Sequence, residues 1–222
     1  MRVISIMEHL PGIRQSRDIE AYVARACKST GESPELVREK IKVLVAEKSH
    51  IAATTRPDIV ALARTRSMPL MSHDDTDIAH IEDGVAEGVS ISEFPCSMEA
   101  AEAARAAGMR IVAGAPNLVR GGSQSGNIAV RDLLAARLVD ILASDYVPRS
   151  MLDAAFMISA DPGLDYDLPS AVAMVTRSPA LAGGLTDRGA IETGLKADLI
   201  RVDLQDGHPF AKSVWRSGHR VA

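Results

Sequence analysis

The sequence predicts an α/β fold with a parallel sheet, and two observations lead to this prediction. Five short apolar runs each end in polar residues, and they are nearly continuous in Val, Ile, Leu and Met rather than alternating. Strands that are buried on both faces, as in a parallel sheet, have this composition. Segments with helical spacing lie between these runs. Strand and helix therefore alternate along the chain, which is the order of an α/β fold.

The predicted strands are RVISIMEH, MPLMSHDD, GVSISEFP, MRIVAGAPN and LVDILASDY, at residues 2–9, 68–75, 88–95, 109–117 and 138–146. The predicted helices between them lie at residues 33–50, 77–88, 97–109 and 127–138. Ser33 followed by Pro34 is typical of a helix start. Ser97 is a second candidate N-cap, and Gly108 is typical of a helix end.

The chain changes character after residue 146. A helical region is expected up to about residue 182, and the tail then reads as short strands joined by glycines and charged turns. This shift in composition near residue 184 predicts two units. We expect an α/β unit over residues 1–183 and a small β unit over residues 184–222.

Composition and charge exclude several classes of protein. Hydrophobic residues make up 46% of the chain and charged residues 24%, which is ordinary for a soluble globular protein. The net charge of −4 argues against a nonspecific nucleic-acid binder, which needs a basic face. The sequence has no run of the roughly 20 apolar residues that span a bilayer, and no signal-peptide layout. Cys27 and Cys96 match no zinc or disulfide framework. We expect a cytoplasmic protein without a membrane or nucleic-acid partner.

Polar side chains gather where the predicted strands end. In parallel α/β sheets and barrels, the loops after the carboxyl ends of strands carry the chemistry. The residues at these positions are Glu8, His9, His73, Asp74, Asp75, Glu93, Asn117 and Asp145. Together they predict one convergent polar site.

His9, His73 and Asp145 are the strongest candidates within this predicted site. Each histidine follows an apolar run, where a neutral imidazole can reach a metal ion. The alternative is a hydrogen-bonded loop histidine, but the repeated pattern favours metal ligands. Asp145 can bind a metal and accept a proton from its water, or it can be a helix N-cap. Asp74 and Asp75 are expected to orient His73 or shape the site.

The loop GAPNLVRGGSQSGN, at residues 114–127, has the composition of a phosphate site. Arg120 is a potential bidentate phosphate partner, Ser123 and Ser125 offer hydroxyl donors, and a helix is expected after Asn127. Glycines let backbone N–H groups approach an anion. No GK[ST] sequence follows, so this is not a Walker motif. The alternative is a flexible surface loop.

A second polar segment follows His9 in EHLPGIRQSRD. Arg14, Gln15 and Arg17 either meet phosphate there or face solvent. No G-x-S-x-G elbow is present, and neither cysteine has an activating pattern beside it. We therefore expect neither a serine nor a cysteine nucleophile.

Several motifs resemble the amidohydrolase superfamily. The tail GAIETGLKADLIRVD resembles the G-x-I-x-x-G-x-x-A-D-L run that enters a small β domain in these enzymes. SIMEHLPGIRQSRD, SHDDT, SEFPCSMEAA, GAPNLVRGGSQSGN and ILASDYVPRSMLDAAF resemble successive motifs of one metal-dependent family in it. These are the diphosphatases of the phosphonate carbon–phosphorus lyase pathway.

The resemblance implies hydrolysis of alpha-D-ribose 1-methylphosphonate 5-triphosphate to the 5-phosphate and pyrophosphate. It implies that a water activated by a divalent metal ion, such as zinc or manganese, attacks a phosphorus atom. It also implies a distorted (β/α)8 TIM barrel, of which this chain has about the last five strands.

The resemblance assigns roles to individual residues. It implies His9, His73, Asp145 and Glu8 as metal ligands, with Asp145 and His73 also catalytic. The implied substrate contacts are Arg14, Gln15, Asn117, Arg120, Ser123, Gln124, Ser125 and Asn127. Two positions differ from the family pattern: Glu8 replaces the usual aspartate, and Gln124 replaces the usual histidine. Glu8 keeps a carboxylate, whereas Gln124 is no proton donor.

The H-x-H metal motif of the first barrel strand is absent from this sequence. The chain also begins inside a predicted strand, so we expect it to be the carboxy-terminal portion of a longer protein. Such a partial barrel exposes sheet edges that invite pairing with another chain, as a homo-oligomer or through those edges. We predict little or no hydrolase activity for this chain alone. The alternatives are an amidohydrolase acting on a C–N bond and a noncatalytic remnant that binds a ligand or partner.

Overall fold

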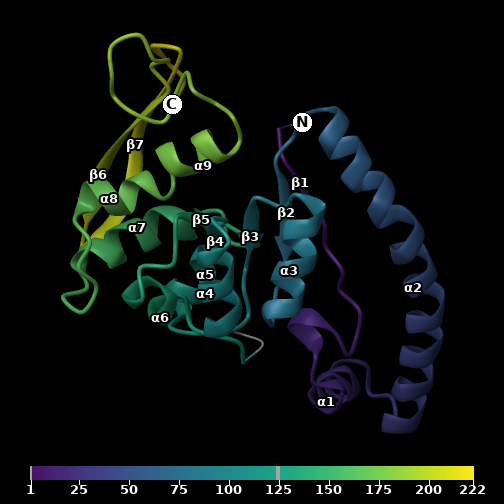
Figure 1. The fold of residues 1–222 in the computed structure, drawn as a ribbon. Coiled ribbons are helices and arrows are strands. Elements are labelled where there is room, and N and C mark those ends of the chain that lie inside the picture. Colours follow the sequence, from purple (N-terminus) through teal and green to yellow (C-terminus); the bar gives the residue numbers. More distant parts are fainter. Residues whose placement is uncertain (1, 124–125) are drawn as a thin grey trace.

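A parallel sheet with sequential strand order forms the centre of the molecule (Figure 1). The computed structural model describes residues 2–123 and 126–222. Within them the strands are β1 (Ile4–Ser5), β2 (Leu70–His73), β3 (Ile91–Glu93), β4 (Arg110–Gly114) and β5 (Ile141–Ala143). All neighbours pair in parallel, in the order β1-β2-β3-β4-β5. The predicted α/β class and its five parallel strands are confirmed.

Helices connect these strands. They are α1 (Ile19–Thr30), α2 (Pro34–Thr65), α3 (Ile78–Glu87), α4 (Met98–Ala106), α5 (Ala115–Arg120) and α6 (Val130–Ala135). The chain continues after β5 with α7 (Ser150–Ala160), α8 (Leu168–Ala173) and α9 (Arg177–Ala182). The two predicted N-caps are confirmed, because Ser33 accepts a hydrogen bond from the backbone of Leu36 and Ser97 accepts one from Ala100.

Two segments differ from the prediction. The helix expected to end near residue 50 continues to Thr65 and passes through Pro57. Buried Val60 and Ala63 anchor its last turns in the core, so packing outweighs the hydrogen bond that proline removes. The loop predicted at residues 114–127 begins with a helix, α5, which has proline in its first turn and a left-handed glycine at its end.

The core lies mainly between the sheet and the helices that follow β2 to β5. Ile111 on β4 and Ile158 on α7 are fully buried in it, together with Leu133 and Leu134 of α6. Aliphatic residues supply nearly all of this core, as the low aromatic content of 3% requires. The packing holds the strands firmly, so the positions of their carboxyl ends are well fixed.

A second sheet follows near the C-terminus. Its strands β6 (Leu199–Gln205), β7 (His208–Arg216) and β8 (His219–Arg220) pair antiparallel in that order. The prediction of short strands in the tail is confirmed. Strand β7 packs against α7, and in Figure 1 this sheet lies far from the long helix α2. Among the helices in the described ranges, we find none with the length and apolarity to cross a membrane.

Candidate metal centre

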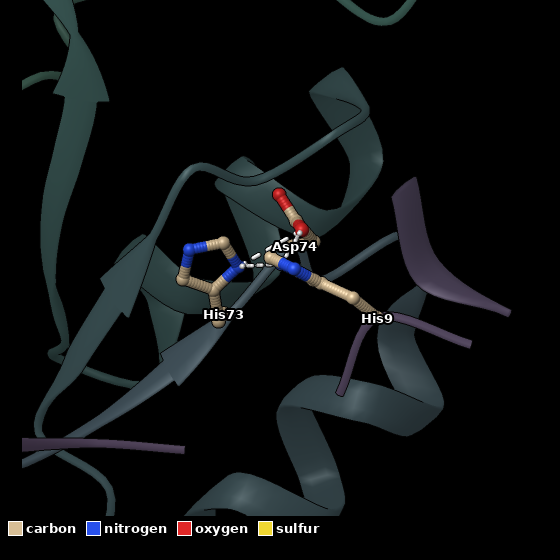
Figure 2. A group of neighbouring side chains, drawn as sticks. All are labelled: His9, His73 and Asp74. Atoms are coloured by element: carbon tan, nitrogen blue, oxygen red, sulfur yellow. Dashed lines mark hydrogen bonds and ion pairs between the residues drawn. The ribbon is translucent and has the colours of Figure 1, made fainter. Parts of the chain in front are cut away.

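Three polar side chains converge at the carboxyl end of β2 (Figure 2). His73 is the last residue of β2, Asp74 follows it, and His9 comes from the loop after β1. Nε2 of His9 lies 3.4 Å from Nδ1 of His73 and 3.3 Å from Oδ2 of Asp74. Nδ1 of His73 lies 2.8 Å from the same Asp74 oxygen. Residues 64 positions apart in the sequence thus form one triangle of ligand atoms.

Two sides of the triangle have the length expected between neighbouring ligands of a metal ion. Ligand bonds of about 2.0–2.2 Å in a tetrahedral site place neighbouring ligand atoms roughly 3.3–3.6 Å apart. Both distances from His9 have this length, whereas the contact between His73 and Asp74 is closer. Oδ2 of Asp74 is buried, and no described residue gives it a hydrogen bond of good geometry, although both imidazoles face it. A carboxylate oxygen in this position fits a divalent cation.

The backbone at Asp74 directs its carboxylate into the triangle. Asp74 has φ +57°, in the left-handed region that aspartate adopts more readily than most residues. Its backbone N–H donates to the carbonyl of Glu93 at 2.9 Å, which ties this turn to β3. Figure 2 shows the Asp74 carboxylate turned toward the two imidazole rings.

His73 lies in a buried and negatively charged environment. Its ring packs edge-to-face on Phe94, and Nε2 lies 4.0 Å from the carboxylate of Glu93, which also accepts a hydrogen bond from Ser5 at 2.6 Å. Burial alone lowers the pKa of His73, but the close contact with the Asp74 carboxylate at 2.8 Å and the charges of Asp74 and Glu93 outweigh it, so this pKa is raised. The same acidic groups that attract this proton would attract a cation.

A pocket, which we call the strand-end pocket, opens beside this triangle. Its lining includes Asp74, Gln15, Asn117, Arg120, Ser123, Asn127 and Asp145. The fold therefore brings six residues predicted to contact substrate or metal to one cavity with Asp74. Gln124 and Ser125, also predicted to contact substrate, lie outside the residues that the structure describes.

Several of these pocket residues also have partners inside the protein. Asn117 accepts a hydrogen bond from the backbone of Val130 at 3.0 Å, and so it fixes the start of α6. Arg120 donates to the hydroxyl of Tyr146 and to the carbonyl of Gly122, both at 3.0 Å. These contacts hold Asn117 and Arg120 at the pocket wall.

Three predicted site residues lie apart from the triangle. Asp145 is exposed and lines the strand-end pocket. Glu8 lines a different pocket, between the loop after β1 and α2, which His9 also lines. Arg14 is buried and forms an ion pair with Asp75 at 2.9 Å. Metal binding by Asp145 and Glu8 and phosphate binding by Arg14 stay predictions.

Comparison with known proteins places the chain in a family. The model of the amidohydrolase family (Amidohydro_3) matches residues 13–221. The chain belongs to the amidohydrolase family. This amidohydrolase is 42% identical over 99% of its length to the alpha-D-ribose 1-methylphosphonate 5-triphosphate diphosphatase of Escherichia coli (strain K12). It spans 58% of that relative's length. The resemblance that the sequence motifs indicate is confirmed.

Solved structures support the fold of this amidohydrolase. An amidohydrolase from Thermotoga maritima MSB8 aligns with 99% of the chain and 62% of its own, with a TM-score of 0.59 and 18% identity. A prolidase complexed with N-methylphosphonate-L-proline aligns over 73% of this chain and 47% of its own, with a TM-score of 0.54 and 21% identity. Both likenesses concern the fold alone.

The sequence of this amidohydrolase predicts that Asp74 orients His73 or shapes the site, and the structure places its Oδ2 within the triangle. The sequence pattern that indicates this position is an aspartate directly after a histidine at the end of a strand. Such a residue reaches back to the imidazole only if its backbone is left-handed, and aspartate tolerates that conformation.

The two cysteines should differ in reactivity. Cys96 is buried at the strand-end pocket, and burial raises the pKa of its thiol to about 12, whereas Cys27 is half-buried. We expect iodoacetamide at pH 8 to alkylate Cys27 at least about tenfold faster than Cys96, because the thiolate is the nucleophile. Mass spectrometry of the metal-free native chain measures both rates. Urea-unfolded chain is the control, in which the rates should converge. Equal rates in the native chain would contradict the burial of Cys96.

Proposed function

We propose that this chain carries the metal-binding region of a diphosphatase that hydrolyses alpha-D-ribose 1-methylphosphonate 5-triphosphate. The products are the 5-phosphate and pyrophosphate. The observation that carries the proposal is the triangle of His9, His73 and Asp74 beside a pocket lined by Arg120 and polar side chains. The 42% identical relative, which bears this activity in its name, supports the substrate.

We also propose that the five parallel strands are part of a (β/α)8 barrel. Their sequential order supports a barrel, because doubly wound sheets reverse their strand order part-way across. The proposed barrel unit covers residues 1–183, and residues 184–222 form the proposed small β unit. The exposed sheet edges are proposed to pair with further chain, either in the same molecule or in a partner.

The proposed reaction uses the triangle and the residues of the strand-end pocket differently. His9, His73 and Asp74 would hold a divalent ion, zinc or manganese, and this ion would make a water acidic enough to attack near neutral pH. Arg120 binds the negative charge of the triphosphate, and Asn117, Asn127 and the Ser123 hydroxyl orient it. Asp145, which also lines this pocket, accepts the proton of the attacking water. Water oxygen bonds to phosphorus as the bond to the departing pyrophosphate breaks.

Pyrophosphate release tests this function. We expect low turnover by the 222-residue chain with zinc or manganese, and higher turnover when the amino-terminal part of the E. coli relative is joined ahead of Met1. His73→Ala in the joined protein should abolish the gain. Hydrolysis of a cyclic amide in preference to the triphosphate would overturn the proposed substrate. Metal analysis that finds no bound ion in either protein would overturn the proposed mechanism.

A further inference from the structure

The buried ion pair between Arg14 and Asp75 lies next to the triangle, because Asp75 follows Asp74 in the chain and Arg14 also donates to the carbonyl oxygen of His73. We propose that this pair, the Arg14–Asp75 clamp, holds the loop after β1 against β2 and thereby places His9 beside His73. Arg14 and Asp75 are then positioning residues for the metal centre. The inference rests on the proposed function, because His9 needs this place only if the triangle binds a metal.

Asp75 is fully buried, and both its oxygens have donors. Oδ1 accepts from Nη1 of Arg14 at 2.9 Å. Oδ2 accepts from the hydroxyls of Ser72, on β2, and Ser92, on β3, the latter at 2.8 Å. Asp75 is therefore fixed to two neighbouring strands, and it presents one oxygen to the loop that carries His9.

Arg14 completes the connection from the loop side. It is only 6% exposed, and the same Nη1 also donates to the carbonyl oxygen of His73 at 2.9 Å. Arg14 thus contacts the backbone of His73, a proposed metal ligand, and the side chain of Asp75. Its φ of +46° is an uncommon conformation for arginine, and such conformations persist where the surroundings determine them.

His9 depends on this loop for its position. Its side chain is 55% exposed, and within the described residues its polar contacts are with His73 and Asp74. The backbone N–H of Ile6 donates to the carbonyl of Met71, on β2, at 2.9 Å. The loop is therefore attached to β2 at Ile6 and again at Arg14, with His9 between the two attachments.

The burial of Arg14 favours a clamp over a phosphate contact. The described lining of the strand-end pocket includes the neighbouring Gln15 but not Arg14. A guanidinium that already donates to Asp75 and His73 inside the protein would have to give up these bonds to reach a phosphate. Lysine cannot reproduce this arrangement fully, because its ammonium is a point charge rather than a planar fork.

Two measurements on the 222-residue chain test the clamp. The first is the nuclear Overhauser effect between the imidazole protons of His9 and His73 without metal, whose ring centroids lie 5.0 Å apart. The second is zinc affinity, measured by competition with a chelator. We expect Arg14→Met to remove the imidazole contact and weaken zinc binding by about 10- to 100-fold, the usual effect of losing a group that orients a metal ligand. Arg14→Lys should restore part of both.

Arg105→Met is the matched control, because it removes another arginine–aspartate pair, that of Arg105 with Asp140, away from the triangle. It should leave both readouts unchanged. In a His9→Ala background, Arg14→Met should weaken zinc binding no further, since its effect acts through His9. An additive loss would overturn the positioning role and point to general damage of the fold.

The outcomes separate this inference from the proposed function. If the wild-type chain shows the imidazole contact and loses it in Arg14→Met but binds no zinc, the clamp stands and the metal site fails. If zinc binds and Arg14→Met changes neither readout, the clamp fails and the metal site stands. If Arg14→Met does not fold, the same two measurements are made on Asp75→Asn and Arg14→Lys. A contact between His9 and His73 as strong as in the wild type, in both of these variants, would overturn the clamp.

Discussion

Replacing Asp74 with asparagine should weaken zinc binding by at least about 100-fold, because even groups that only orient a ligand contribute about 10- to 100-fold. Oδ2 of Asp74 is the carboxylate oxygen of the triangle, and it lies within 3.3 Å of both imidazoles. Asparagine keeps the size of this side chain but removes its charge. Chelator competition at pH 8 measures the loss.

The same substitution should not lower the melting temperature of the metal-free chain. Asp74 is 1% exposed, and its Oδ2 has no hydrogen bond of good geometry among the described residues. An ionised carboxylate that is buried without such hydrogen bonds costs free energy, and relief of this cost offsets the attraction to the two imidazoles that asparagine removes. A lower melting temperature together with weaker zinc binding would indicate a damaged fold rather than a lost ligand.

Asp77→Asn is the matched control for Asp74→Asn. Asp77 lies three residues away and caps α3 by accepting from the backbone of His80 at 3.1 Å. Asparagine caps helices about as well as aspartate, so helix α3 should be unaffected. Zinc affinity should stay at its wild-type value, and a comparable loss in Asp77→Asn would contradict a specific role for Asp74.

The strand ends could be predicted from the sequence because their signal is local. An apolar run that stops at a polar residue identifies a buried strand and its end. Parallel pairing then places successive ends at one edge of the sheet, as the register of His73 with Glu93 shows. The approach of His9 to His73 follows from the same pairing of β1 with β2.

The position of Asp74 and the pairing of Arg14 depend on information that a local pattern lacks. Asp74 enters the triangle through one left-handed backbone angle. Arg14 and Arg17 look alike in the sequence, but only the pairing of Arg14 with an aspartate 61 residues away buries it. Helix α5, in contrast, is predictable from the local sequence, because Pro116 in its first turn and Gly121 after its last residue are typical of a helix start and end.

Replacing Gly189 with alanine should destabilise the chain by about 2–5 kcal/mol, from the sum of a left-handed backbone penalty and overpacking. Gly189 begins the GAIETGLKADL run and has φ +94°. A Cβ there would lie 2.8 Å from the Cα of Arg177 and 3.2 Å from the Cβ of Ala180. Both contacts are with α9, whose backbone cannot move away as a flexible side chain would. Urea denaturation measures the loss.

Gly31→Ala is the control that measures the free-energy cost of the left-handed backbone conformation alone. Gly31 follows α1 with φ +74°, but a Cβ there would meet no atom within 4 Å. Its loss should be about 1 kcal/mol, from the left-handed conformation alone. Equal losses at the two glycines would contradict a close approach at Gly189. A larger loss at Gly189 would explain physically why the GAIETGLKADL run begins with glycine. This glycine lies against α9, and α9 packs Ala182 against the cluster that contains Ile141 of β5. Gly189 would then allow the segment before the C-terminal sheet to pack closely on α9, and through α9 on β5, the strand that precedes Asp145.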